Sequence, residues 1–112
     1  DERVFRADRT GDLSTGLAVL VDGDTASAAE IVVGALRDNG RAKLFGQTTL
    51  GKGSVQEIYD LADGSSLHVT SAIWPTPDGD PIAGEGLTPD IPVEAEGGDA
   101  SLRRAVEYLE SE

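Results

Sequence analysis

The chain has 112 residues, 38% of them hydrophobic, so by size it is one domain with a modest core. Nine Lys and Arg against 21 Asp and Glu leave a net charge of −12. This balance argues against nucleic acids and anionic membranes as partners, because both attract basic surfaces. The sequence contains no cysteine, which excludes disulfides, thiol catalysis and thiolate metal sites.

The first predicted elements are a strand, a helix and a second strand. Residues 1–16 are polar, with at most a short strand around Val4. A run of five apolar residues at 17–21 predicts a buried strand, and residues 42–45 predict another. The helix between them is expected to end at the Asn-Gly pair at 39–40. Its apolar face should consist of Ala28, Ile31, Val32, Ala35 and Leu36. This order predicts two parallel strands joined by a crossover helix.

The second half of the chain predicts a hairpin, an irregular segment and a closing helix. A glycine-rich loop at 46–54 leads into strands at 55–61 and 66–74. In the later strand Leu67, Val69, Ser71 and Ile73 alternate with His68, Thr70, Ala72 and Trp74, which predicts that one of the two faces is buried. Residues 75–92 carry all five prolines and predict an irregular surface segment. A helix is expected at 99–109, with an apolar face formed by Leu102, Val106 and Leu109.

Ser27 is the first candidate for a catalytic group. It lies where the first strand turns into the helix, and with Glu30 it fits a capping box, the commonest reason for a serine at a helix start. The catalytic interpretation rests on its position, because rigid elements on both sides would hold it. The N–H of Ala28 would point out of the helix start, where the helix dipole favours a developing negative oxygen. Both interpretations of Ser27 stay open.

Lys52 lies 25 residues further on and is the candidate base. A solvated lysine is protonated at neutral pH, so a base role requires burial in an apolar pocket away from carboxylates. Gly51 and Gly53 allow the tight backbone path that such burial needs. Gln56 could hold the lysine amine through its amide oxygen, or it could be an ordinary residue of the strand surface.

The same region permits other interpretations. Residues 46–52 have the spacing that begins a phosphate-binding loop, but Gly53 stands where Ser or Thr would hold magnesium, and a strand is expected next instead of a helix. His68 is the only histidine, and no carboxylate is placed to orient it, which disfavours a Ser-His-Asp triad. The acidic residues of the proline-rich segment do not follow the ligand spacing of a calcium site. These residues are Asp78, Asp80, Glu85 and Asp90. We therefore expect no metal and no cofactor.

Together these motifs resemble those of the C-terminal processing peptidases, also called tail-specific proteases. The matching stretches are 19–31, which contains Thr-Ala-Ser-Ala-Ala-Glu, 46–56, which contains Gly-Lys-Gly-Ser-Val-Gln, and then 76–79, 84–91 and 102–109. Several spaced motifs in the same order make the resemblance more specific than any one of them. The resemblance covers nearly the whole chain.

The resemblance implies a serine peptidase with a Ser/Lys dyad. Ser27 would be the nucleophile, Lys52 the general base and Gln56 the residue that orients Lys52, while the backbone N–H of Ala28 would be one oxyanion donor. Peptide bonds would be cleaved through an acyl-enzyme, in protein substrates at or near the C-terminus and in an extracytoplasmic compartment. The implied fold is crotonase-like, an α/β protein with a mixed sheet.

The resemblance also implies that residues 1–112 are the C-terminal part of a catalytic domain. The PDZ domain of the family and its upstream core segment, which carries a second oxyanion donor, have no counterpart in the sequence. They are expected as partners, together with protein or peptide substrates and, as an alternative to a monomer, a second copy in a homo-oligomer. Loss of one oxyanion donor costs about 100- to 1,000-fold in rate, so this chain alone should have little or no activity.

Two rival interpretations follow from the same residues. One is a non-catalytic module of the same fold that binds a peptide or another ligand. The other is a nucleotide-binding protein built on the loop at 46–52.

Overall fold

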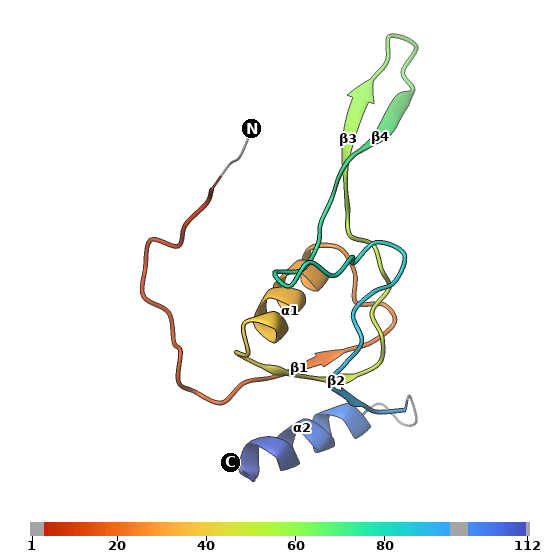
Figure 1. Cartoon of the computed structure of the whole chain (residues 1–112). Helices are drawn as coiled ribbons and strands as arrows, with labels where there is room; N and C mark the ends of the chain where they lie inside the picture. Colours follow the sequence, from red (N-terminus) through yellow and green to blue (C-terminus); the bar gives the residue numbers. More distant parts are fainter. Residues whose placement is uncertain (1–3, 95–98, 112) are drawn as a thin grey trace.

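The computed structural model describes residues 4–94 and 99–111, apart from the side chains of Val55 and of residues 70–72 (Figure 1). The elements in chain order are β1 (Ala18–Val21), α1 (Ala28–Asp38), β2 (Lys43–Gly46), β3 (Ser54–Asp60), β4 (Ser66–Ile73), β5 (Ile91–Pro92) and α2 (Ala100–Glu110). This is a mixed α/β protein. Neither helix of the described part is long and apolar enough to cross a membrane.

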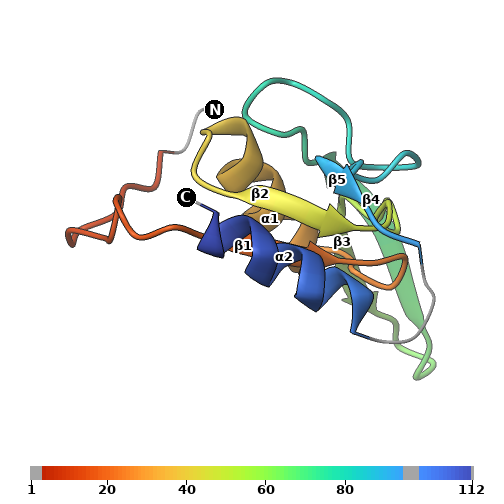
Figure 2. The same cartoon turned by 90° about the horizontal axis from the view of Figure 1, so that it is seen from below.

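A three-stranded parallel sheet with the order β1-β2-β5 forms the centre of the molecule. α1 connects β1 to β2 as a crossover helix, which confirms the predicted strand–helix–strand unit. α2 lies along the opposite side of the sheet from α1, so the sheet is enclosed between two helices (Figures 1 and 2). β5 falls within the segment predicted to be irregular. Its Pro92 lacks a backbone N–H, and proline is tolerated in a strand that lies at the edge of a sheet.

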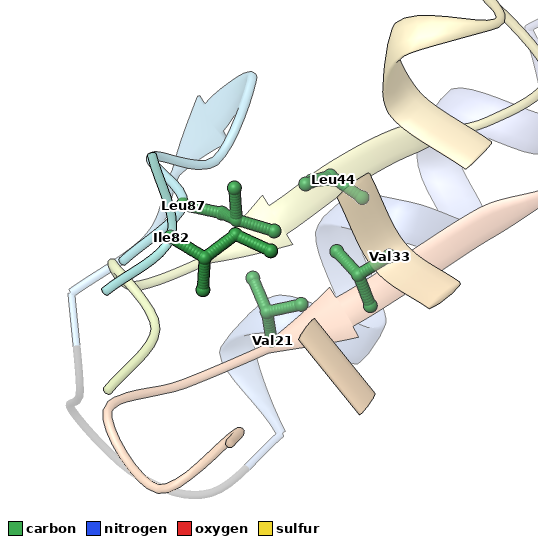
Figure 3. Close-up of a cluster of buried hydrophobic side chains, with 5 residues drawn as sticks. All are labelled: Val21, Val33, Leu44, Ile82 and Leu87. Carbon is green, nitrogen blue, oxygen red and sulfur yellow. The ribbon is translucent and has the colours of Figure 1, made fainter. Parts of the chain in front are cut away.

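The hydrophobic core lies between α1, the sheet and the segment that follows β4 (Figure 3). Its fully or almost fully buried side chains are Val21, Val33, Leu44, Ile82 and Leu87. Each such side chain contributes about 1.5–3 kcal/mol relative to exposure. Because two of the five come from the 82–87 segment, the core fixes this proline-rich stretch against the sheet although most of it has no regular structure.

The buried face of each helix differs, wholly or in part, from the predicted one. In α1 the buried residues are Glu30, Val33 and Gly34, whereas Val32 is 58% exposed. In α2 Ala105 is buried, and the predicted apolar residues Leu102, Val106 and Leu109 are exposed. The predicted face is therefore wrong for α2 and only partly right for α1, where Ile31 packs against the core and Ala35 and Leu36 are half-buried. Gly34 explains α1, because the absence of a side chain lets the helix approach Thr76 and Leu87 closely.

The β3–β4 hairpin projects away from the rest of the molecule (Figure 1). Its ladder is antiparallel, with one register shift between Val55 and Gln56. The prediction of one buried face is wrong, because Leu67 and Ile73 on one side are 51% and 63% exposed and Trp74 of the alternate set is 44% exposed. The register shift places one extra residue on β4, so side chains beyond it point to the other face. An isolated hairpin has no second layer to cover it, and its apolar side chains stay in contact with solvent.

Candidate active site

Ser27 occupies a strained turn between β1 and α1. Its φ is 57° and its ψ is −122°, and it is the only non-glycine residue of the described part with a positive φ. Such conformations cost of order 1–3 kcal/mol and cluster at functional sites. The preceding turn is held by Asp22, whose carboxylate accepts the N–H groups of Asp24 and Thr25. Ser27 is exposed, so its hydroxyl can be approached from solvent.

The loop that carries Lys52 follows β2 and lies against this turn. The N–H of Leu50 donates to the carbonyl oxygen of Thr25 at 2.9 Å. The N–H of Gly84 donates to the carbonyl oxygen of Gly51 at 2.8 Å, which joins the loop to the 82–87 segment. The loop is therefore held on two sides.

The buried carboxylate of Glu30 connects the Ser27 turn to the Lys52 loop. Its side chain is 0% exposed and accepts four hydrogen bonds, two at each oxygen. Oε2 accepts the N–H of Ser27 and the N–H of Lys52, both at 2.9 Å. Oε1 accepts the N–H of Gly51 at 2.7 Å and the hydroxyl of Thr49 at 2.6 Å. The backbones of both candidate dyad residues thus meet at one oxygen atom.

These hydrogen bonds also set the ionisation of Glu30. Burial raises the pKa of its carboxyl, but the hydrogen bonds from Thr49, Gly51, Lys52 and Ser27 outweigh burial, and the pKa lies below its ordinary value. A carboxylate with all its lone pairs occupied is satisfied as an anion even without solvent. Glu30 is therefore ionised at neutral pH and belongs to the framework of the site.

The glycines on both sides of Lys52 are required by close backbone approaches. Gly51 has φ +90°, a conformation that favours glycine, and a Cβ there would lie 2.9 Å from the backbone N of Gly86. A Cβ on Gly53 would lie 2.5 Å from the Cβ of Ile82. The predicted tight backbone path around Lys52 is confirmed.

The other predicted site residues occupy two different elements. Gln56 lies in β3 at the register shift and is exposed. Ala28 is the first residue of α1, and the hydrogen bonds of the described residues include none donated by its backbone N–H. This N–H is among the first four of the helix, which have no partner within the helix.

Lys52 itself is exposed in this structure. Two cavities among the described residues have volumes of about 310 and 440 Å³, and neither is lined by Ser27 or Lys52. The first lies beneath residues 13–17, and the second lies beside residues 46–48 and 88–94. The exposure of Lys52 differs from the burial that the sequence predicts for a lysine acting as a base.

The other candidates that the sequence offered are His68 and the acidic residues of the proline-rich segment, and no hydrogen bond between described residues joins them to Ser27 or Lys52. His68 is in β4, where its Nε2 lies 3.3 Å from the hydroxyl oxygen of Ser66. The N–H of Leu44 donates to the carboxylate of Asp90 at 2.7 Å, so this acid holds β2. No group of three or more metal-ligating side chains occurs within the described ranges. The loop around Lys52 leads directly into β3, whereas a phosphate-binding loop requires a helix there.

Sequence reasoning missed the roles of Glu30 and Thr49. Glu30 was interpreted only as half of a capping box, and that box is present. Three of its four hydrogen bonds instead go to the Lys52 loop, 19 to 22 residues further on. Thr49 is buried, and its hydroxyl also accepts the N–H of Leu87 at 2.7 Å. A glutamate at a helix start predicts a local cap, and nothing in the neighbouring residues predicts hydrogen bonds to a loop about 20 residues away.

The family model of peptidase family S41 matches residues 1–93. A strained serine at a helix start, a lysine loop held to it and this family match agree, and the chain belongs to peptidase family S41.

The similar proteins include C-terminal processing peptidases. The chain is 48% identical over 94 residues to the carboxy-terminal-processing protease of Bartonella bacilliformis, covering 81% of this chain and 22% of that protein. It is 46% identical over 92 residues to the chloroplastic carboxyl-terminal-processing peptidase 2 of Arabidopsis thaliana, covering 80% of this chain and 18% of that protein. The chain thus spans about a fifth of the length of these curated relatives.

A solved structure matches the fold as well. The photosystem II D1 C-terminal processing protease aligns with a TM-score of 0.70 and 41% identity, over 86% of this chain and 25% of that one. The mixed α/β arrangement described above is therefore the arrangement of a C-terminal processing protease over most of this chain.

Proposed function

We propose that this chain is part of the catalytic core of a serine peptidase that cleaves proteins at or near their C-terminus. Ser27 is the nucleophile and Lys52 the general base, Gln56 orients Lys52, and the N–H of Ala28 is one oxyanion donor. The observation that supports this most strongly is that the backbones of Ser27 and Lys52 both donate to Oε2 of Glu30 at 2.9 Å. Membership of a peptidase family supports it independently.

The chemistry follows from these roles. The neutral amine of Lys52 takes the proton of Ser27 Oγ as this oxygen attacks the peptide carbonyl carbon. The carbonyl oxygen becomes negative, and the N–H of Ala28 and the positive end of the α1 dipole stabilise it. Collapse expels the amine, which receives the proton from Lys52. Water then attacks the acyl carbon while Lys52 accepts its proton; the ester bond to Ser27 Oγ breaks, Lys52 returns the proton to Oγ, and the new carboxyl group is released.

The exposure of Lys52 makes a second polypeptide segment necessary for this mechanism. A general base must be neutral, and removal from solvent favours the neutral amine. We propose that residues 1–112 are the C-terminal part of the catalytic domain, that the crotonase-like core is completed by an upstream segment, and that this segment covers Lys52 and supplies the second oxyanion donor. A PDZ domain would capture protein or peptide substrates, in an extracytoplasmic compartment, and a homo-oligomer is an alternative to a monomer.

A chimera tests the proposal. The matching 94 residues of the Bartonella bacilliformis protease are replaced by the corresponding residues of this chain, and cleavage of an unfolded protein is measured. The chimera should cleave, whereas the 112-residue chain alone should show little or no activity. Ser27→Ala should abolish cleavage, and Lys52→Ala should lower its rate by about 100-fold or more.

Two matched controls accompany these variants. Lys43 is the only other lysine and is exposed in β2, so Lys43→Ala should leave the rate unchanged. Ser14→Ala changes an exposed serine of the N-terminal segment and should also have no effect. Cleavage that survives Ser27→Ala would contradict the proposed nucleophile, and a folded chimera that does not cleave would favour a non-catalytic binding module. Strong cleavage by the isolated chain would contradict the need for an upstream segment.

A further inference from the structure

The Glu30 carboxylate makes more contacts than a helix cap requires. A capping box needs one hydrogen bond from the glutamate, here the bond from the N–H of Ser27. The other three come from Thr49, Gly51 and Lys52, none of which belongs to α1. Burial of an ionised carboxylate is costly, and an exposed glutamate could form the same cap without that cost. Helix capping therefore does not account for this side chain.

We propose that Glu30 is a positioning residue that sets the placement of Lys52 relative to Ser27. Oε2 accepts both of these residues' N–H groups, so a single atom joins the turn of the nucleophile to the loop of the base. Oε1 holds the neighbouring Gly51 and prevents the loop from rotating about one contact. The consequence for catalysis rests on the proposed function. The hydrogen bonds of Glu30 are independent of it.

Thr49 extends the same network to the 82–87 segment. Its hydroxyl donates to Oε1 of Glu30 and accepts the N–H of Leu87, so its one proton and one of its lone pairs are used. Thr49 is buried, and its side chain lies between the two partners. The loop of Lys52 is thereby fixed from α1 on one side and from a core segment on the other.

The first test measures hydrogen exchange at individual amides of the 112-residue chain by NMR. In Glu30→Gln one of the two oxygens becomes an NH₂ group, which cannot accept the N–H groups that faced it. Exchange at Ser27, Gly51 or Lys52 should increase by about 10-fold or more, whereas exchange in α2 should not change. An equal increase in α2, or no increase at the three amides, would overturn the proposal.

A pair of Thr49 variants keeps the proposal falsifiable if Glu30→Gln does not fold. Thr49→Val keeps the shape and removes the hydroxyl, and Thr49→Ser keeps the hydroxyl. Exchange at Gly51 and Leu87 should increase in Thr49→Val and stay at the wild-type rate in Thr49→Ser. The same exchange rates in the two variants would show that the hydroxyl does not hold the loop, and would overturn the network.

The second test measures catalysis in the chimera described above. Displacement of a catalytic group by about 1 Å can cost 100-fold in rate, so Glu30→Gln should lower kcat by about 100-fold while KM changes little. A fall in kcat/KM caused only by a higher KM would overturn positioning. Failure of the proposed function is recognised separately, because Ser27→Ala would then stay active while the exchange measurements still decide the role of Glu30.

Discussion

Gly53 lies between Lys52 and the start of β3. Its backbone lies so close to the core that no side chain fits there. A Cβ at this position would lie 2.5 Å from the Cβ and 2.7 Å from the Cγ2 of Ile82, which is itself buried. Neither atom is the end of a flexible side chain. Any larger residue must therefore displace either the loop of Lys52 or the core residue beneath it.

We predict that Gly53→Ala destabilises the fold by about 1–3 kcal/mol, in the range of other overpacked core positions. Urea unfolding of the 112-residue chain measures this difference. Gly23→Ala is the matched control, because a Cβ there meets no atom within 4 Å, and its unfolding free energy should stay within about 0.5 kcal/mol of wild type. Equal effects of the two substitutions would contradict the proposed contact.

Two carboxylates make stability depend on pH in the acidic range. Burial raises the pKa of Asp38, but hydrogen bonds from Thr76, Asp78 and Arg37 lower it below its ordinary value, as hydrogen bonds do for Glu30. A carboxyl with a lower pKa in the folded state stabilises the fold above its unfolded pKa. That contribution is lost as the pH falls from its unfolded pKa through its folded pKa.

We predict that Asp38→Asn lowers the unfolding free energy by about 1–3 kcal/mol at pH 7. The difference from wild type should shrink as the pH falls below about 4, because the wild-type carboxyl then also becomes neutral. Urea unfolding at a series of pH values between 7 and 3 measures it. A difference that is the same at every pH would show that the charge of Asp38 contributes nothing.

At the scale of elements, α2 packs on the sheet through Ala105 and Tyr108, and its predicted apolar face stays exposed. Ala105 is buried, and the ring of Tyr108 lies 5.4 Å from the ring of Phe45 at an interplanar angle of 55°. Tilted aromatic pairs of this kind contribute about 0.5–1.5 kcal/mol beyond the area they bury. The apolar residue Leu102 is 51% exposed.

We therefore predict that Tyr108→Ala destabilises the chain by about 2–4 kcal/mol, whereas Leu102→Ala costs less than about 1 kcal/mol. Thermal and urea unfolding of both variants test this order. The reverse order would mean that the face predicted from the apolar pattern is the one that α2 buries.

At the scale of the whole molecule, the β3–β4 hairpin is the part that the core does not include. Tyr59 and Leu67 face each other across the ladder and are 50% and 51% exposed. A cross-strand pair contributes about 0.2–1 kcal/mol, far less than a buried core residue such as Leu44. The stability of the chain should therefore depend on its parallel sheet and the two helices packed on it, and hardly on the hairpin.

We predict that Tyr59→Ser combined with Leu67→Ser changes the unfolding free energy of the 112-residue chain by less than about 1 kcal/mol. Leu44→Ala should cost about 2–5 kcal/mol in the same assay. A large effect of the hairpin variant would show that these side chains are buried in solution. In the chimera the same double variant should be more costly if the added segments cover the hairpin.

Local sequence patterns were sufficient for the order of the elements and for the position of the candidate residues on them. The parallel pair with its crossover helix, the serine at the start of α1 and the lysine between two glycines all follow from neighbouring residues, and each is confirmed. The catalytic roles of Ser27, Lys52, Gln56 and Ala28 stay predictions. They rest on resemblance and on the geometry around Glu30.

Contacts between distant segments decided the rest. Which face of α1 and α2 is buried depends on the 82–87 segment and on Phe45, and no apolar spacing within a helix contains that information. The bulge in the hairpin and the pairing of β5 with β2 likewise require two strands to meet. Glu30 is the clearest case, because its three partners in the Lys52 loop lie 19 to 22 residues away and only folding brings their N–H and O–H groups to one carboxylate.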